Sequence, residues 1–406
     1  MDDLHRIQKA ADLLRPHIIE TPLIFAPSLS RMFDAEIYLK LENLQRTGSF
    51  KVRGATVKLL QGVANRTISP SGVVAASAGN HAQGVAWASR IVHLSATIVM
   101  PQWASISKQE ATRNYGAKVI LHGTTIEACL SHAQALADQG LTLVHPFDDE
   151  QVILGQASVG LEIVSQLPAV DQIIVPIGGG GLMAGICMAV KAQCPKTRMI
   201  GVQTAVCPSA RTSLAAGHPV AVPASPSIAD GISVKQVGKR TFDVIRQHVE
   251  CVALVSEEQI ATSILMLLER KKILAEGAGA TPLAALLGRK IKVARGQKVV
   301  LVISGGNLDS PLLGRILNQG LVKNGRLTRV RIRLDDVPGA LAGLLTCIAE
   351  QKANVLHIHH DRYRVDVPLY VTRVELELET RSKQHIDDLL AALDQAGYVV
   401  ESHSTC

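Results

Sequence analysis

The chain has 406 residues, of which 47% are hydrophobic and 19% charged, which excludes an intrinsically disordered protein and suggests two or three domains. Aromatic residues make up only 3%, a composition that favours helices packed on buried parallel strands over a β-sandwich. The net charge is +7, yet from Thr328 onward nine Lys and Arg stand against twelve Asp and Glu. No run of Lys or Arg exceeds three residues and no aromatic residues interleave, so the charge favours a small-anion site over nucleic-acid binding.

The sequence contains no membrane span and no signal peptide. It has no uncharged apolar run of about eighteen residues, and acids instead of an apolar core follow Met1. The seven cysteines are odd in number and form no Cys-x-x-Cys pair, which indicates reduced thiols. These features predict a cytoplasmic protein without a membrane partner.

The first 320 residues alternate short β-branched runs with helical patterns, in an order that predicts parallel sheets covered by helices. The predicted strands are Glu36–Leu41, Val73–Ala76, Ala96–Met100, Lys118–Leu121, Gln172–Pro176, Met199–Gln203 and Lys298–Ile303. The predicted helices include Ala82–Arg90, Ile126–Asp138 and Gln259–Lys271. In such a fold, ligands bind at the carboxyl ends of the strands.

From Thr328 the hydrophobic pattern changes to that of strands with one solvent-exposed face. Arg329–Leu334 and Val371–Glu379 alternate charged and apolar residues, and helical patterns fall at Ala340–Gln351 and Lys383–Ala396. The order predicts a βαββαβ, ferredoxin-like unit. Asn318–Leu327, with two glycines and mixed charge, is predicted to be a linker.

Four glycines, Gly178 to Gly181, follow the strand Gln172–Pro176 and open a helix. Backbone N–H groups at such a helix start point at an anion, so the segment predicts a phosphate cradle. The spacing also fits a dinucleotide fingerprint, but Gln203 stands where that motif needs an acid, which disfavours a nicotinamide cofactor.

Lys51 falls in the first turn of a helix that follows the Thr47-Gly-Ser49 turn. The helix dipole disfavours a cation there, which would lower the pKa of the amine and favour a nucleophilic lysine. Most lysines are solvated surface charges, so this position alone does not establish the role.

Two further polar turns follow predicted strands. Ser77-Ala-Gly-Asn-His81 offers free N–H groups that could hold a carboxylate, although an ordinary helix cap explains it as well. Ser304-Gly-Gly-Asn307 offers a hydroxyl at the carboxyl end of a strand, or is a plain turn.

Together these motifs resemble the fold-type-II pyridoxal-phosphate enzymes of the serine/threonine dehydratase group, over roughly residues 5 to 317. The matching stretches, in the order of that family, are Thr21-Pro-Leu23, Ser49-Phe-Lys-Val-Arg-Gly-Ala55, Ser77–His81, Gly178–Gly181, Ala229-Asp-Gly231, Glu276-Gly-Ala-Gly279 and Ser304–Asn307. The segment from Thr328 resembles an ACT amino-acid-sensing module, through Asp335–Leu341 and Ala353–Val355.

The resemblance implies a catalytic domain over residues 1–317, with a small subdomain at about 46–150 inserted in a larger one, a linker at 318–327 and an ACT domain at 328–406. The cofactor implied is pyridoxal 5'-phosphate. Lys51 would carry it covalently and Ser304 would face its pyridine nitrogen. The remaining cofactor-binding residues implied are Phe50, Asn80, Gly178, Gly179, Gly180, Gly181 and Leu182.

The reaction implied is the deamination of threonine or serine to a 2-oxo acid and ammonia, with Lys51 removing the Cα proton. The substrate carboxylate would lie on the backbone of Ser77, Ala78, Gly79, Asn80 and His81. An amino-acid effector would bind the ACT residues Asp336, Gly339, Ala340, Leu341 and Asn354. A homo-oligomer is expected.

Three features bear on alternatives. Gln203, Cys207 and Ser209 occupy positions where relatives place ligands of a divalent cation, and no carboxylate remains, so we expect no metal. Related serine racemases use a serine where this chain has Ala78, which disfavours an amino-acid racemase. A non-catalytic sensor is disfavoured because Lys51, Asn80, the glycine loop and Ser304 are all present.

Overall fold

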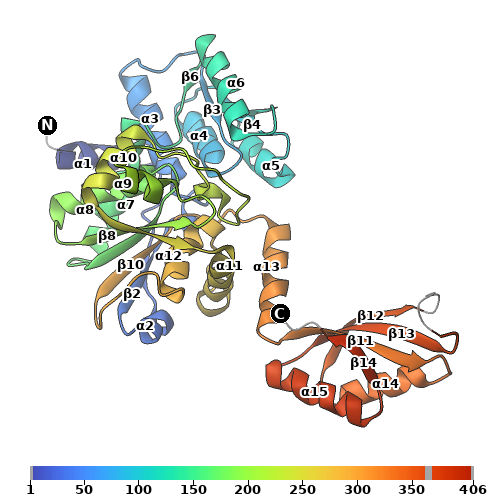
Figure 1. The fold of residues 1–406 in the computed structure, drawn as a ribbon. Coiled ribbons are helices and arrows are strands. Elements are labelled where there is room, and N and C mark those ends of the chain that lie inside the picture. Colours follow the sequence, from blue (N-terminus) through green and yellow to red (C-terminus); the bar gives the residue numbers. More distant parts are fainter. Residues whose placement is uncertain (1–2, 362–367, 404–406) are drawn as a thin grey trace. The chain divides into compact units, whose positions relative to one another are not determined.

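The computed structural model describes residues 3–361 and 368–403 and divides into two compact units, Met1–Asp309 and Ser310–Cys406 (Figure 1). The segment predicted as a linker, Asn318–Leu327, is partly helical: helix α13 (Ser310–Lys323) covers its first six residues, and Leu327 opens strand β11. Apolar residues recur at helical spacing through α13, and this pattern outweighs the cost of Gly320, about 1 kcal/mol. The boundary between units therefore falls before α13 and not at residue 317.

The large sheet of the first unit has six strands in the order β1-β2-β10-β7-β8-β9, parallel except for β1. Their bounds are β1 Leu23–Phe25, β2 Glu36–Leu41, β7 Gln172–Pro176, β8 Arg198–Thr204, β9 Val249–Val255 and β10 Lys298–Ile303. The bounds of β2, β7 and β10 are those predicted, and β8 is longer by one residue at each end. The sequence analysis did not identify β1 or β9.

A smaller sheet of four parallel strands lies within the same unit, in the order β5-β4-β3-β6. Its strands are β3 Val73–Ala76, β4 Ala96–Met100, β5 Lys118–Leu121 and β6 Thr142–Leu143. Three of them have the predicted bounds. The two-residue β6 was missed because it is too short to show periodicity.

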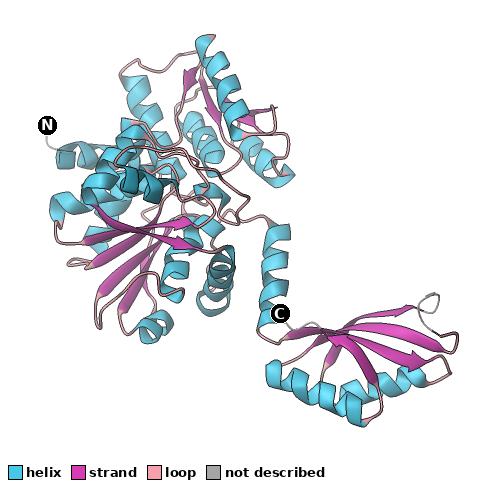
Figure 2. Cartoon of the chain, viewed as in Figure 1, coloured by secondary structure: helices cyan, strands magenta, loops and turns pink. Residues whose placement is uncertain are grey.

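Helices cover both sheets (Figure 2). The α-helices of the first unit are α1 Asp3–Leu14, α2 Pro27–Phe33, α3 Lys51–Ala64, α4 Asn80–Ile91, α5 Ile106–Asn114, α6 Ile126–Asp138, α7 Glu150–Gln166, α8 Gly181–Gln193, α9 Ser209–Ala216, α10 Lys239–His248, α11 Glu257–Met266 and α12 Gly277–Leu287. Short turns of 3₁₀ or π-helix are η1 Glu42–Leu44, η2 Asp230–Ile232 and η3 Leu267–Lys271. Among the described residues, no helix is both long and apolar enough to cross a lipid bilayer.

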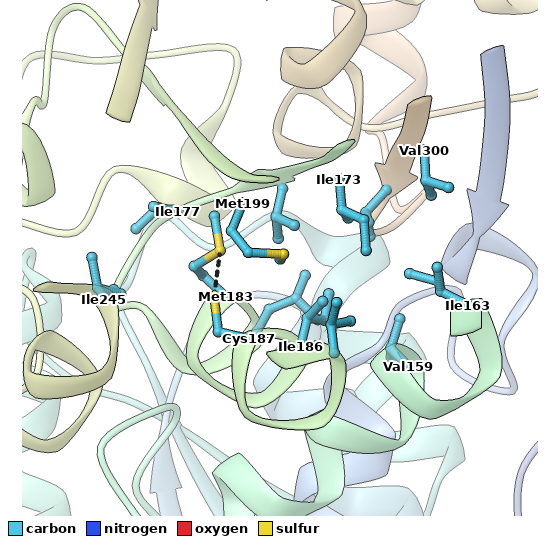
Figure 3. Close-up of a cluster of buried hydrophobic side chains, with 14 of the residues drawn as sticks. Val159, Ile163, Ile173, Ile177, Met183, Ile186, Cys187, Met199, Ile245 and Val300 are labelled. Atoms are coloured by element: carbon cyan, nitrogen blue, oxygen red, sulfur yellow. Dashed lines mark hydrogen bonds between the residues drawn. The ribbon is translucent and has the colours of Figure 1, made fainter. Parts of the chain in front are cut away.

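The largest core of the unit forms where helices α7 and α8 pack on the six-stranded sheet (Figure 3). Val159 of α7 and Ile186 of α8 meet Ile173 and Val300 of the strands beneath them, all of them buried. These strands are continuous apolar runs because helices remove both of their faces from water. The carboxyl ends of β7 and β10 therefore lie over a rigid base.

A buried ionic cluster holds helix α3 against this base. The guanidinium of Arg53, which is 0% exposed, donates to both carboxylate oxygens of Glu42 at 2.8 Å and to Glu162 at 2.6 Å. Lys40 Nζ, also 0% exposed, donates to the other oxygen of Glu162 at 2.5 Å. Charges taken out of water in this way are tolerated only when each is paired and hydrogen-bonded.

Helix α3 also runs unusually close to helix α7. A Cβ at Gly155 would lie 2.6 Å from the carbonyl oxygen of Arg53, so only glycine allows this approach. The ionic cluster and the glycine contact together fix the position of the first turn of α3, which carries Lys51.

The second unit has the predicted βαββαβ order and a four-stranded antiparallel sheet, β12-β13-β11-β14. Its elements after α13 are β11 Leu327–Asp335, α14 Ala340–Glu350, β12 Asn354–Asp361, β13 Val371–Glu379, α15 Lys383–Gln395 and β14 Val399–His403. Both helices pack on one face of the sheet, over a core that includes Ile332, Leu376 and Leu389 (Figure 1). Residues 362–367 and 404–406 of the domain predicted at 328–406 lie outside the described residues.

Replacement of Arg53 by Met should lower the free energy of unfolding of the first unit by about 3–5 kcal/mol, because it leaves the buried carboxylate of Glu42 without its cationic partner and leaves Glu162 with Lys40 alone. Urea unfolding followed by tryptophan fluorescence measures this, since Trp87 and Trp103 both lie in the first unit. Arg198→Met is the matched control, because its pair with Glu250 is about half exposed and should contribute less than about 1 kcal/mol. Equal effects of the two replacements would contradict the role given to the buried cluster.

Candidate active site

Lys51 is the first residue of α3, and its side chain is partly buried. The Nζ atom donates to the carbonyl of Pro146 at 2.9 Å and lies 5.2 Å from the ring centroid of Phe50. Burial lowers the pKa of Lys51 to about 8, although the charge of Glu276 acts in the opposite direction. A buried amine with a lowered pKa can serve as nucleophile and as base near neutral pH.

The glycine loop, Gly178–Gly181, connects β7 to α8. Gly180 has a φ of +97°, a backbone conformation that favours glycine. The carbonyl of Gly179 accepts from Thr241 Oγ1 at 2.7 Å and from the backbone N–H of Gly238 at 3.1 Å, which fixes the loop. Because the first N–H groups of α8 have no acceptor within the helix, they can bind an anion.

A loop that the sequence analysis did not single out, His145–Asp149, joins the lysine to the glycine loop. It supplies the Pro146 carbonyl to Lys51, and a Cβ at Gly179 would lie only 2.2 Å from the ring of Phe147. Asp148 accepts from the backbone N–H groups of Lys239 and Arg240, at 3.1 and 2.9 Å. The available signal was a His-Pro-Phe-Asp-Asp run at the carboxyl end of a strand, but β6 was too short to be identified.

Asn80, the first residue of α4, belongs to a chain of three polar side chains. Its Nδ2 donates to both oxygens of Glu276, at 2.8 and 2.9 Å, and its Oδ1 accepts from Asn307 at 2.7 Å. Asn307 also donates to the carbonyl of Thr47 at 2.8 Å. Glu276 and Asn307 belong to stretches that match the family in sequence, but no local pattern indicated that their side chains contact Asn80.

Burial raises the pKa of Glu276 to about 7, although the hydrogen bond from Asn80 opposes the shift. The carboxyl is therefore partly protonated at neutral pH. The negative charge of Glu276 also raises the pKa of Lys51 slightly, so the two groups act on each other through the site.

The Ser77–His81 turn has only part of its predicted carboxylate-binding backbone free. The N–H of Ser77 donates to Val99 at 3.1 Å, and that of Gly79 donates to the Ser77 hydroxyl at 3.1 Å. The other three residues, Ala78, Asn80 and His81, stand at the start of α4, where N–H groups face away from the helix. A Cβ at Gly79 would meet nothing within 4 Å, so open space lies beside the turn.

The imidazole of His81 is buried, with Nε2 2.9 Å from the carbonyl of Val144. Burial and the nearby Lys51 lower its pKa to about 3. His81 is therefore neutral, and its side chain supports the turn rather than the binding of an anion.

Ser304 directly follows the last residue of β10 and is 2% exposed. Its carbonyl accepts from the N–H of Phe50 at 3.1 Å, and Gly305 forms an isolated bridge with Ser49. Close backbone contact thus brings the Ser304–Asn307 turn to the start of α3. Lys51, Asn80, the glycine loop and Ser304 all lie at one edge of the two sheets, as the positions of the strand ends predict.

Gln203 is buried, and its side chain is fully used within the protein. Its Oε1 accepts from the N–H groups of Ala210 and Arg211, at 2.9 and 3.1 Å, and its Nε2 donates to Ile177 at 3.2 Å. This amide joins β8 to the start of α9, an arrangement that offers no hard-cation ligand. Across residues 3–361 and 368–403, no group of three His, Cys, Asp or Glu side chains is placed to hold a metal ion.

The predicted effector residues of the second unit do not form one cluster within a chain. Gly339, with a φ of +93°, leads into α14 next to the end of β11, together with Asp336, Ala340 and Leu341. Asn354 of β12 instead pairs with Glu379 of β13, whereas Asp335 of β11 pairs with Val371 of β13. Eight residues of β13, or about 26 Å, separate Val371 from Glu379. The five residues predicted to bind one effector therefore cannot all do so within one chain.

Comparisons with known proteins assign the family. The sequence model described as "Pyridoxal-phosphate dependent enzyme" matches residues 14–305, so the chain belongs to this family of enzymes. The chain is 47% identical to the L-threonine ammonia-lyase of Geobacter sulfurreducens over 396 residues, which cover 97% of this chain and 98% of that protein.

Solved structures are also similar. A threonine deaminase from T.th. has a TM-score of 0.70 and 37% identity, and the match covers 75% of this chain and 98% of that one. Maize serine racemase has a TM-score of 0.74 and 32% identity, over 79% of this chain and 98% of that one.

The residues present fit pyridoxal 5'-phosphate, the cofactor of this family. The glycine loop with its free helix N-terminus suits the phosphate, and the buried amine of Lys51 suits covalent attachment. When bound, the cofactor supplies an acceptor for the electrons left at Cα after loss of its proton. The protein would contribute the base, the anion-binding backbone and a site shielded from water.

The cofactor-free chain should show a Lys51 amine that titrates near pH 8. Because the ordinary pKa of a lysine is 10.5, the folded chain loses stability as the pH falls from about 10.5 to about 8, where the unfolded chain binds a proton that the buried amine does not, and the loss is complete below pH 8. Carbon NMR of chain labelled at lysine Cε measures the midpoint, with the signal assigned by its loss in Lys51→Arg. A midpoint above 10 would contradict the buried environment described here.

Proposed function

We propose that this chain is a threonine ammonia-lyase that also accepts serine. The observation that carries the proposal is the Lys51 amine, which donates to the carbonyl of Pro146 and has a pKa lowered to about 8 by burial. The similarity to a protein named L-threonine ammonia-lyase over nearly the whole of both chains supports the choice of substrate. The products would be a 2-oxo acid and ammonia.

Each site residue has a defined task in this reaction. The N–H groups of Ala78, Asn80 and His81 bind the carboxylate of the substrate. The neutral amine of Lys51 removes the Cα proton. Ser304 presents a hydroxyl, a far weaker acid than a carboxyl, to the ring nitrogen of the cofactor. A hydroxyl in this place would not protonate that nitrogen, which would favour loss of the β-hydroxyl over other outcomes.

The replacement Lys51→Ala should lower turnover of L-threonine by at least about a hundredfold, because general-base catalysis contributes about 10²–10⁴-fold. Release of 2-oxo acid from L-threonine and L-serine measures this, with Lys58→Ala as control. Lys58 lies on the same helix but pairs with Asp149 at 2.7 Å. Turnover of neither amino acid by the unmodified enzyme would reject the proposal.

A second candidate is an amino-acid racemase, because maize serine racemase is among the similar structures. Inversion needs an acid on the face opposite Lys51, and Ala78 has no proton to give. Chiral chromatography of L-serine reactions should find D-serine far below pyruvate. Formation of D-serine at a rate comparable to pyruvate would favour the racemase, and an increase in Ala78→Ser alone would support the argument from Ala78.

We also propose that the second unit is an ACT domain that binds an amino-acid effector. Its βαββαβ order and antiparallel sheet support this assignment, as does the turn before α14. Because Asp336 and Asn354 lie at opposite ends of the sheet, a site that uses both requires a second copy of the chain. This favours a homo-oligomer.

A chain that ends at Asp309 should keep threonine turnover within about threefold but lose its response to amino-acid effectors. The threonine deaminase from T.th. matches only 75% of this chain yet is covered almost completely, which supports a stable catalytic unit. Turnover of both chains with and without isoleucine and valine provides the test. An unchanged response in the shortened chain would contradict the regulatory role.

A further inference from the structure

The side chain of Asn80 has two neighbours that determine which way its amide faces. Glu276 accepts from Nδ2, whereas Asn307 donates to Oδ1. A flipped amide would place Oδ1 against the Glu276 carboxylate and Nδ2 against the Asn307 donor, so both contacts would become repulsive. Asn307 itself cannot turn freely, since its other contact is with the Thr47 carbonyl.

This arrangement leaves one hydrogen of Asn80 uncommitted. The two Glu276 oxygens lie 2.8 and 2.9 Å from Nδ2, nearly equal distances that place one N–H between them. The second N–H is then directed elsewhere from the same nitrogen. It is the hydrogen that Asn80 can offer to a ligand in the site.

We propose that Glu276 is a positioning residue, which orients Asn80 as a donor toward the cofactor and weakens that donation when it loses its own proton. An N–H that donates to a carboxylate enriches the nitrogen in electrons, so the remaining N–H becomes a poorer donor. The charge of an ionised Glu276 also repels an anionic acceptor. The proposal rests on the proposed function in that it requires the site to bind pyridoxal 5'-phosphate. It does not depend on which amino acid is the substrate.

The surroundings of Glu276 make its proton titratable in the working range. It lies at the N-terminus of α12, where the helix favours the charged form. Lys51 of α3 and Lys108 of α5 also favour the charged form, whereas Asp230 of η2 disfavours it. Burial is the largest influence and raises the pKa of Glu276 to about 7.

Gly305 completes the contact. A Cβ there would lie 2.5 Å from Glu276 Oε1, so the turn after Ser304 packs directly on the carboxyl. The N–H of Glu276 donates to the carbonyl of Gly305 at 3.0 Å. The backbone of Glu276 is thus tied to the same turn on which its carboxyl packs.

The test uses the full chain and pyridoxal 5'-phosphate as the probe. Glu276→Gln keeps an oxygen that accepts from Asn80 but removes the charge, and Glu276→Ala removes both. Asp171→Asn is the control, because Asp171 accepts from the N–H of Lys298 at the opposite end of the sheet. The cofactor dissociation constant is measured from pH 5.5 to 9 for each protein.

The ratio of the wild-type to the Glu276→Gln dissociation constant cancels the titration of the cofactor. The titration midpoint of Lys51 is measured in both proteins and its contribution is removed, because the charge of Glu276 raises the pKa of Lys51. We expect this ratio to be near one at low pH and to rise at least about threefold as pH increases through 7. For Asp171→Asn the ratio should stay flat. A flat ratio for Glu276→Gln would overturn the proposed effect of the charge.

Glu276→Ala should weaken cofactor binding about threefold or more at pH 5.5, where the wild-type carboxyl is protonated, since loss of a hydrogen bond to a neutral group is worth that much. Cofactor binding as tight as that of the wild type would overturn the positioning role. If Glu276→Ala does not fold, the visible absorption of the cofactor in Glu276→Gln decides. We expect the absorption of the wild type to change near pH 7 and that of Glu276→Gln to stay constant there. A change of absorption near pH 7 in Glu276→Gln would overturn the proposal. All these measurements concern cofactor binding and do not depend on which amino acid the enzyme converts. If the proposed substrate is wrong, the protein would bind the cofactor normally but would not turn over threonine or serine.

Discussion

The position of Lys51 depends on the charges buried two residues farther along its helix. Arg53, Glu42, Glu162 and Lys40 neutralise one another in a place without water, and each has several hydrogen-bond partners. A buried ion pair adds little net stability compared with apolar packing, but the loss of one partner is costly. The cluster therefore acts mainly as a geometric constraint, because only one placement of α3 relative to η1 and α7 satisfies all four charges.

The constraint has a chemical consequence in the site. Since α3 cannot move away from the strand ends, the amine of Lys51 stays in a dry environment, and burial keeps its pKa near 8. The same burial keeps His81 neutral and leaves Glu276 close to half-protonated at neutral pH. One physical cause, exclusion of water by packed helices and strand ends, thus sets the protonation of three neighbouring groups.

The two units bury their sheets in different ways. The first unit buries parallel strands between helices, and its polar groups meet where the strands end. The second unit has a sheet with one wet face, on which Arg331 and Glu375 of neighbouring strands pair. A sheet of this kind suits recognition of a small molecule or of a second chain, in line with the regulatory role proposed for it.

Most of the fold could be predicted from the sequence, because buried strands such as Lys298–Ile303 and wet ones such as Val371–Glu379 have local patterns that few other structures satisfy. The glycine loop could be identified in the same way, since its role follows from residue type and position at a helix start, whereas Lys51 could be identified only together with the other motifs. The rest of the site depends on contacts that form only in the folded chain. The contact of Asn80 with Glu276 joins residues 196 positions apart, and the Pro146 loop follows a strand of two residues. Likewise, Gly320 suggested a linker, but the packing of α13 outweighs its effect. Local pattern reports burial and backbone preference, whereas pairings between distant side chains and the pKa values they create exist only once the chain has folded.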